Sequence, residues 1–152
     1  MLSIGCPVMT TQSAQLDWPL ADALRYPARL IEEFEWERTL EGGGLFGDRN
    51  VRTVVKEPVG VVAAITPSNF PIEVILNKLG PALATGNTVV FKPDPNTRGK
   101  ATRLGRLIAE RTDIPAGVAN VVPTPSNEVA GLLGTDPRVD MISFTGSPSA
   151  SY

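Results

Sequence analysis

The pattern of apolar and polar positions divides the chain into a short helical part and a longer part in which strands and helices alternate. Apolar residues recur at helical spacing over residues 19–40, and Pro27 inside this stretch predicts a kink or two short helices. A glycine-rich loop follows at 41–48. The runs 51–56 and 59–66 then predict two extended segments. The second is so uniformly apolar that we expect a strand covered on both faces.

From residue 59 onward the order of predicted elements is strand, helix, strand, helix, strand, helix, strand. Such alternation predicts an α/β fold, here a partial Rossmann-like parallel sheet with flanking helices. Ligands bind such open sheets at the carboxyl ends of the strands, so the exit loops 66–71, 92–97 and 145–149 form the candidate site. After the strand at 59–66 we expect a helix at 72–85, a strand at 88–92, a helix at about 100–111, a strand at 118–122, a short helix capped by Ser126, and a strand before Gly146-Ser147.

Composition narrows the classes of function. The chain has 152 residues, enough for one domain, and a formal net charge of -2, which gives no basic footprint for nucleic acid. No apolar run approaches the ~20 residues that cross a bilayer, and the N-terminus lacks the pattern of a secretory signal. A single cysteine, Cys6, excludes an internal disulfide, and the absence of histidine removes the commonest metal ligand. We therefore expect a cytoplasmic protein with no metal site, no nucleic-acid partner and no membrane partner.

Each exit loop contains polar residues that could bind a ligand, but each of them also has an ordinary structural explanation. In the loop 66–71 the prolines stiffen the backbone around Asn69, whose amide could stabilise an oxyanion or could simply satisfy a tight turn. Lys92 could bind ribose hydroxyls or a phosphate, or could be a solvated lysine that ends a strand. Gly146 and Ser147 precede an expected helix start, which could bind a pyrophosphate or be an ordinary serine cap. Neither of the standard glycine-rich phosphate loops is present.

The order of four motifs is far more specific than any one loop. The stretches EPVGVVAAITPSNFP, NKLGPALATGNTVVFKP, IPAGVANVV and DPRVDMISFTGS, from about Glu57 to Ser147, resemble the NAD(P)-dependent aldehyde dehydrogenase superfamily. The resemblance implies that Lys92 lies against the adenosine ribose and that Asn69 donates to the oxyanion. It also implies that Gly146 and Ser147 meet the pyrophosphate. The residues implied to line the cofactor cleft near the nicotinamide are Ile65, Thr66, Pro67 and Ser68.

The chain departs from the family pattern at several positions. Ser68 stands where the family usually has Trp or Phe, and Ser151 where a glycine is common. Pro95 replaces a glutamate that often grips the ribose hydroxyls, so the choice between NAD and NADP stays open. The family's general-base glutamate and nucleophilic cysteine lie beyond the glycine-serine motif, and Cys6 matches neither. We therefore expect this chain to be inactive alone.

These observations combine into one prediction for the organisation and function of the chain. We expect a poorly ordered segment at 1–18, a helical segment with a glycine-rich loop at 19–50, and a partial dinucleotide-binding domain at 51–152. The complete enzyme would oxidise an aldehyde to a carboxylic acid with NAD or NADP. Another chain would have to supply the missing part before an aldehyde could bind. The alternative is a non-catalytic remnant or subunit that binds cofactor or a partner, with self-association through an uncovered apolar sheet edge.

Overall fold

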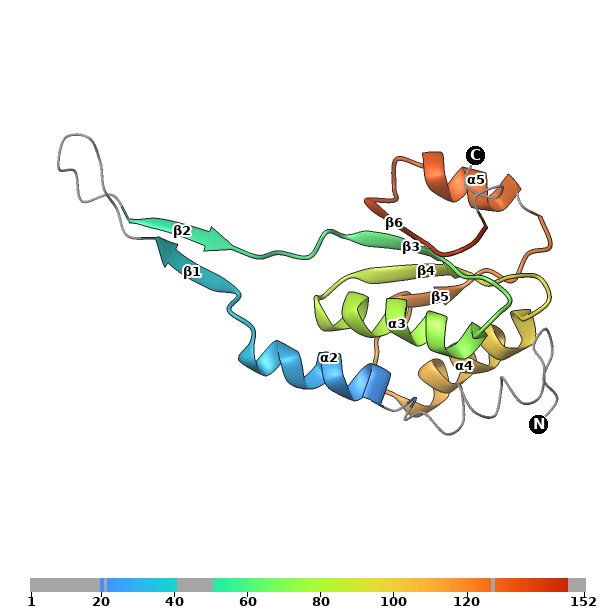
Figure 1. Ribbon diagram of the computed structural model, residues 1–152, viewed down its shortest axis with the longest axis horizontal. Helices are drawn as coiled ribbons and strands as arrows, with labels where there is room; N and C mark the ends of the chain where they lie inside the picture. Colours follow the sequence, from blue (N-terminus) through green and yellow to red (C-terminus); the bar gives the residue numbers. More distant parts are fainter. Residues whose placement is uncertain (1–19, 21, 41–50, 127, 148–152) are drawn as a thin grey trace.

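A parallel sheet forms the centre of the protein (Figure 1). The computed structural model describes residues 20, 22–40, 51–126 and 128–147. The sheet has four strands in the order β5-β4-β3-β6, and all its neighbours pair in parallel. The predicted α/β fold is therefore confirmed. Its strands are β3 (Val61–Ile65), β4 (Thr88–Lys92), β5 (Ala119–Val121) and β6 (Met141–Phe144).

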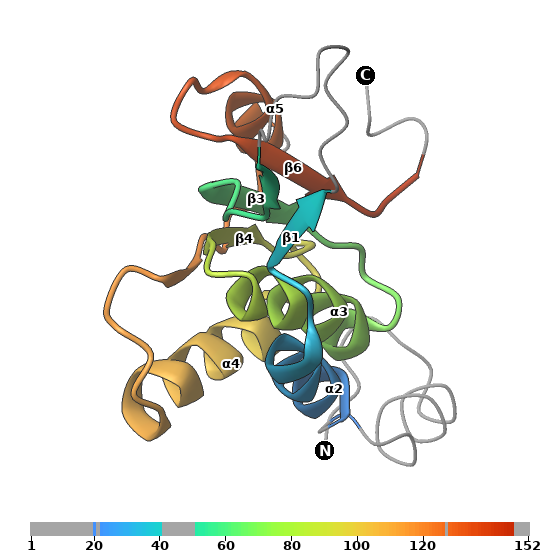
Figure 2. The ribbon, with the colours of Figure 1, turned by 90° about the vertical axis from the view of Figure 1, so that its left-hand side faces the viewer.

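Helices cover both faces of this sheet. The helices α3 (Pro71–Ala84) and α4 (Arg98–Arg111) lie on one face, and α5 (Glu128–Thr135) lies over the other (Figures 1 and 2). The short helix α5 begins as expected after Ser126, whose Oγ accepts a hydrogen bond of 3.1 Å from the backbone N–H of Glu128. Each pair of successive strands is thus joined through a helix, as parallel pairing requires.

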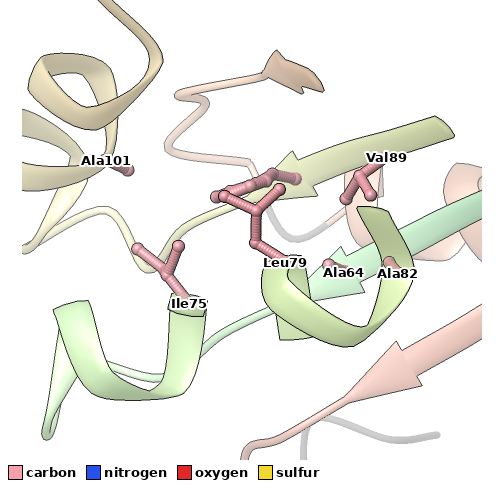
Figure 3. Close-up of a cluster of buried hydrophobic side chains, with 7 residues drawn as sticks. Ala64, Ile75, Leu79, Ala82, Val89 and Ala101 are labelled. Atoms are coloured by element: carbon pink, nitrogen blue, oxygen red, sulfur yellow. The ribbon is translucent and has the colours of Figure 1, made fainter. Parts of the chain in front are cut away.

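The core lies between the sheet and the helices α3 and α4 (Figure 3). Apolar residues at helical spacing along α3 face strand residues of β3 and β4, while another side of α3, which includes Gly80, packs against α2. All of residues 62–65 are buried, so the prediction of a strand covered on both faces is confirmed for β3. The buried cluster consists of Ala64, Ile75, Leu79, Ala82, Val89, Phe91 and Ala101.

Polar side chains accept hydrogen bonds from the backbone at the amino edge of the sheet, where β3 begins. The Oδ1 atom of Asn87 accepts a hydrogen bond of 2.9 Å from the backbone N–H of Gly60. The Oδ2 atom of Asp140 accepts one of 2.8 Å from the N–H of Val61. Gly60 has a φ of 117°, and a Cβ there would collide with the Asp140 carboxylate, so glycine is required on both grounds. These two bonds hold the start of β3 against the chain segments that lead into β4 and β6.

The helix expected over 19–40 is wrong in its second half. The helix α2 (Asp22–Glu33) ends at residue 33 and runs through Pro27 as one element rather than two. Proline has no N–H to donate to the carbonyl of Ala23, and that carbonyl approaches α3 closely. A Cβ at Gly80 would lie only 2.6 Å from it, so Gly80 permits the close packing of α2 on α3.

The residues after α2 form a strand instead of continuing the helix. The strand β1 (Glu37–Leu40) pairs antiparallel with β2 (Arg52–Val55), and Leu40 faces Arg52 in the register. Trp36 starts this pairing, because its carbonyl accepts a hydrogen bond of 2.8 Å from the N–H of Lys56. The two strands form an exposed ribbon that projects from the body of the protein (Figure 1). Cross-strand bonding to β2 therefore outweighs the helical spacing that Leu40 suggested.

Some predictions fall outside the described residues. They are the poorly ordered segment 1–18, the glycine-rich loop 41–48, the helix start after Ser147, and the unusual Ser151. The described helices include none long and apolar enough to cross a membrane.

Candidate functional site at the carboxyl edge of the sheet

The structure brings the three predicted exit loops together at one edge. The N–H of Thr66, just past β3, donates to the carbonyl of Lys92 at the end of β4 over 3.2 Å. On the other side of β3, the N–H of Thr145 donates to the carbonyl of Ile65 over 3.0 Å. Because β3 is central between β4 and β6, its exit loop lies between the other two. This arrangement is what a ligand bound across the ends of parallel strands would meet.

The loop between β3 and α3 reverses direction through a strained residue. Phe70 has φ 47° and ψ 46°, a left-handed conformation that costs a non-glycine residue about 1–2 kcal/mol. Pro71 then occupies the first turn of α3. This turn leaves Asn69 exposed, and its side chain has no hydrogen-bond partner among the residues the structure describes. The amide is thus held on a stiff loop without the backbone bonds that a purely structural role would give it.

Two polar residues at the exits of β3 and β4, Thr66 and Lys92, are buried. Lys92 is 4% exposed, and no hydrogen bond of its side chain is present within the described residues. The Oγ1 atom of Thr66, also 4% exposed, is buried with no hydrogen-bond partner in the same part of the chain. Buried polar groups are nearly always satisfied in native proteins, so the Thr66 hydroxyl fits a polar ligand that gives it a hydrogen-bond partner, and the lysine next to it in the sheet could donate to the same ligand. A dinucleotide, with ribose hydroxyls and phosphate oxygens, supplies suitable acceptors.

At the exit of β6 the Phe144 ring lies close to the backbone of Gly146. A Cβ at Gly146 would lie 2.5 Å from Cζ of Phe144, so no larger residue fits without moving the ring. Ser147 follows and is exposed. The implied contact of this glycine-serine motif with a pyrophosphate stays a prediction.

Sequence reasoning missed Lys100, which lies in the first turn of α4. Its Nζ atom is buried and has no hydrogen-bond partner within the described part of the chain. A signal for it exists in the sequence. The first turn of α4 contains Arg98 and Lys100 but no acidic residue, whereas acidic residues are the favoured ones at a helix N-terminus.

Lys78 was also missed, and no sequence signal could have found it. Its Nζ atom donates a hydrogen bond of 2.8 Å to Oγ of Ser143, which ties α3 to β6. Burial lowers the pKa of Lys78 below its ordinary value of 10.5, because removal from water disfavours the charged form. A lysine in a helix otherwise resembles an ordinary solvated residue.

A hollow away from the exit loops lies between α2 and α3. It has a volume of about 360 Å³, and residues of the two helices, including Tyr26, Arg29, Glu73 and Asn77, line it. None of its lining residues belongs to the three exit loops as predicted. Within the described residues, no group of three metal-binding side chains is present. The carboxyl edge therefore remains the place where the candidate residues gather.

The comparison with known proteins agrees with this geometry. The family model described as "Aldehyde dehydrogenase family" matches residues 2–152. The aminoacetaldehyde dehydrogenase of Pseudomonas aeruginosa is 40% identical over 146 residues, which cover 96% of this chain and 28% of that protein. The succinate-semialdehyde dehydrogenase [NADP(+)] of Escherichia coli is 43% identical over 139 residues, covering 85% of this chain and 28% of the relative.

Solved structures give the same result. A betaine aldehyde dehydrogenase of Staphylococcus aureus, in complex with NAD+, matches with a TM-score of 0.87 and 30% identity, over 99% of this chain and 28% of its own. The Mycobacterium tuberculosis aldehyde dehydrogenase complexed with NAD+ matches with a TM-score of 0.81 and 33% identity, over 98% of this chain and 29% of its own. The chain thus spans little more than a quarter of the length of these relatives. With a family model that matches nearly every residue, the chain belongs to the aldehyde dehydrogenase family.

Proposed function

We propose that this chain binds a nicotinamide dinucleotide, NAD or NADP, at the carboxyl edge of its sheet. The observation that carries the proposal is Lys92 at the end of β4, which is 4% exposed and has no side-chain hydrogen bond within the described residues; its backbone carbonyl bonds the N–H of Thr66, whose buried Oγ1 atom also has no partner in that part of the chain. The matched aldehyde dehydrogenases of S. aureus and M. tuberculosis were solved with NAD+, which supports the same ligand here.

Residues of the different exit loops would bind different parts of the dinucleotide. Lys92 would donate to the adenosine ribose, and Gly146 with Ser147 would receive the pyrophosphate at the β6 exit. The residues that would wall the cleft nearer the nicotinamide are Ile65, Thr66, Pro67 and Ser68. When bound, the cofactor supplies a hydride acceptor for oxidation of the substrate.

The wider reaction is oxidation of an aldehyde to a carboxylic acid. In that reaction Asn69 would donate a hydrogen bond to the oxyanion that forms when a nucleophile attacks the aldehyde carbonyl. The chemistry also needs a thiolate nucleophile and a base that activates water. The single cysteine, Cys6, lies outside the described residues and matches no catalytic position of the family. We propose that the 152-residue chain alone binds cofactor without turning over an aldehyde.

Calorimetric titration with NAD and with NADP tests this proposal. Replacement of Lys92 by methionine keeps the length and apolar stem of the side chain but removes its charge-assisted hydrogen bonds. Cofactor affinity should fall about tenfold. The matched control is Lys56→Met, an exposed lysine next to the ribbon, which should bind as the wild type does. If wild-type protein shown to be folded binds neither cofactor, the proposal is refuted.

A second function, association with a further chain, is favoured by the exposed apolar residues of β6. This strand forms one edge of the sheet, and its Met141 and Ile142 are 48% and 45% exposed. Uncovered apolar edges of this kind mark contact surfaces or aggregation sites. Light scattering over a range of concentrations should show self-association that Ile142→Lys weakens. A monomer at all concentrations would remove this second function.

A further inference from the structure

Lys78 in α3 is half-buried, and the hydrogen-bond partner of its amino group is a hydroxyl instead of a carboxylate. Its Nζ atom donates to Oγ of Ser143 in β6 over 2.8 Å. Within the described residues no acidic side chain forms an ion pair with it. A carboxylate would stabilise the ammonium form, whereas a hydroxyl oxygen accepts an N–H from the ammonium and from the neutral amine alike. The contact therefore favours the charged form far less than a carboxylate would.

The charged groups of the neighbouring elements lie away from Lys78. The strands β3 and β6 contain no ionisable side chain, and Lys92 in β4 is separated from β6 by β3. Glu73, the other ionisable residue of α3, lies about 140° around the helix from Lys78 and lines the hollow toward α2. The helix α4 packs against β5, at the opposite end of the sheet from β6. Burial therefore lowers the pKa of Lys78 below 10.5 without an opposing charge to restore it.

The face of β6 that carries Ser143 is open to small molecules. Met141 lies two residues before Ser143, so both side chains point to the same face of the strand, and Met141 is 48% exposed. Among the strands that the structure describes, only β3 pairs with β6. Ser143 lies opposite Ala64 in the register, one residue before the last residue of each strand. Solvent and small solutes thus reach the strand beside the Lys78 amine, near the carboxyl edge of the sheet.

A partly desolvated amine of this kind is a nucleophile toward carbonyl compounds. The ammonium form has no lone pair, so only the neutral amine attacks, and burial increases the share of neutral amine at neutral pH. The neutral amine can donate one N–H to Oγ of Ser143 and still keep its lone pair free for attack. The hydroxyl therefore orients the nitrogen without blocking its reaction.

We propose that Lys78 is a covalent binding site for small aldehydes, which it captures reversibly as an imine. The lone pair of Nζ forms a bond to the carbonyl carbon, and the carbonyl oxygen takes up a proton that the nitrogen releases. The C–O bond then breaks, and the oxygen leaves as water with the second proton of the nitrogen while the C=N bond forms. Nothing is oxidised or reduced. The inference goes beyond the proposed function, since it needs neither a dinucleotide nor a cysteine.

Reductive trapping with propanal tests this proposal. The folded full chain would be incubated at neutral pH with a low concentration of propanal and with sodium cyanoborohydride, which converts an imine into a stable propylamine. Peptide mapping by mass spectrometry then follows each lysine separately. Lys78 should be modified at least about threefold faster than the exposed Lys56. The ratio should fall as the pH rises toward 10.5, because an ordinary lysine also becomes neutral there.

Variants of Ser143 and Lys56 provide matched controls. Ser143→Asp places a carboxylate beside the amine and holds it in the ammonium form, so the modification of Lys78 should slow to the rate of Lys56 or below. Ser143→Thr keeps the hydroxyl and should react as the wild type does. Lys56→Arg should leave the modification of Lys78 unchanged, and Lys78→Arg should abolish the fast reaction. Circular dichroism shows that each variant is folded.

Three results would overturn the proposal. They are modification of Lys78 no faster than that of Lys56 in the folded wild type, modification as fast in folded Ser143→Asp as in the wild type, and an adduct that survives dilution without cyanoborohydride. An imine hydrolyses on dilution, so we expect the unmodified mass to return. Dinucleotide binding is measured by the separate calorimetric titrations, and its failure would leave the capture of aldehydes by Lys78 intact.

Discussion

Replacement of Asn87 by alanine gives a sharp test of how the sheet is held together. Asn87 is 6% exposed, and its Oδ1 atom accepts from the N–H of Gly60 over 2.9 Å. Its Nδ2 atom donates to Oγ1 of Thr85 over 2.7 Å and to the carbonyl of Ala82 over 3.3 Å. In the variant the Ala82 carbonyl keeps the backbone N–H of residue 87 at 2.9 Å, whereas the Gly60 N–H loses its partner.

The expected loss of stability in Asn87→Ala follows from the hydrogen bonds that it loses. A part-buried donor left unsatisfied costs about 1–3 kcal/mol, and the other lost bonds are partly replaced, so we expect the free energy of unfolding to fall by about 2 kcal/mol. With a urea dependence of about 2 kcal/mol per molar, the unfolding midpoint should fall by about 1 M. Urea unfolding followed by circular dichroism measures this directly.

The control is the same substitution on an exposed helical position. Asn77 in α3 is exposed, and alanine is the better helix former, so Asn77→Ala should unfold at the wild-type midpoint or slightly above it. Amide exchange at Gly60 should accelerate in Asn87→Ala and not in Asn77→Ala. An Asn87→Ala midpoint equal to that of the wild type, with an unchanged slope, would show that the hydrogen bond from Gly60 to Asn87 does not stabilise the sheet.

Two further predictions test packing and charge. On α4, Gly105→Ala should lower the free energy of unfolding by about 1 kcal/mol, because its Cβ would lie 2.7 Å from Cγ2 of Val121. In contrast, Gly99→Ala should raise it by up to about 1 kcal/mol, because nothing lies within 4 Å. Chemical denaturation measures the free energy of unfolding of both variants. Equal changes in the two variants would contradict the close contact of Gly105 with Val121. Hydrogen bonds from the side chain and backbone of Arg138 lower the pKa of Asp136 from 3.8 to about 2. The associated stabilisation is therefore present above pH 3.8 and is lost as the pH falls to about 2. NMR titration of the carboxyl carbon should show a midpoint near 2 that rises toward 3.8 in Arg138→Gln, and a wild-type midpoint near 3.8 would contradict it.

The fold could be predicted because its strands and helices have strong and distinct patterns. An unbroken apolar run predicted β3, and apolar residues three and four apart predicted α3. The helix expected to reach Leu40 failed because its last part pairs with β2, a partner distant in sequence that no local pattern specifies. The helix α2 runs through Pro27 where it packs closely on α3 at Gly80, a tertiary contact that spacing cannot reveal.

The candidate site could be predicted only in outline. The rule for parallel sheets placed the exit loops of β3, β4 and β6 at one edge, and Thr66 and Lys92 do lie side by side there. The left-handed backbone of Phe70 was not predictable, because few non-glycine residues adopt it. Burial of the Lys100 ammonium group was equally hidden, since it depends on how α4 packs and not on the residues near it in sequence.

The most direct test of the account is to map where a nicotinamide dinucleotide binds. We would record amide NMR spectra of the isotopically labelled chain during titration with NADP. We expect shift changes to concentrate at the carboxyl edge, at Thr66, Lys92 and Thr145, while the amide resonances of the amino edge, such as those of Gly60 and Asn87, do not move. Shift changes at the amino edge instead, or none at saturating NADP and NAD, would contradict the claim that this sheet edge is the cofactor site.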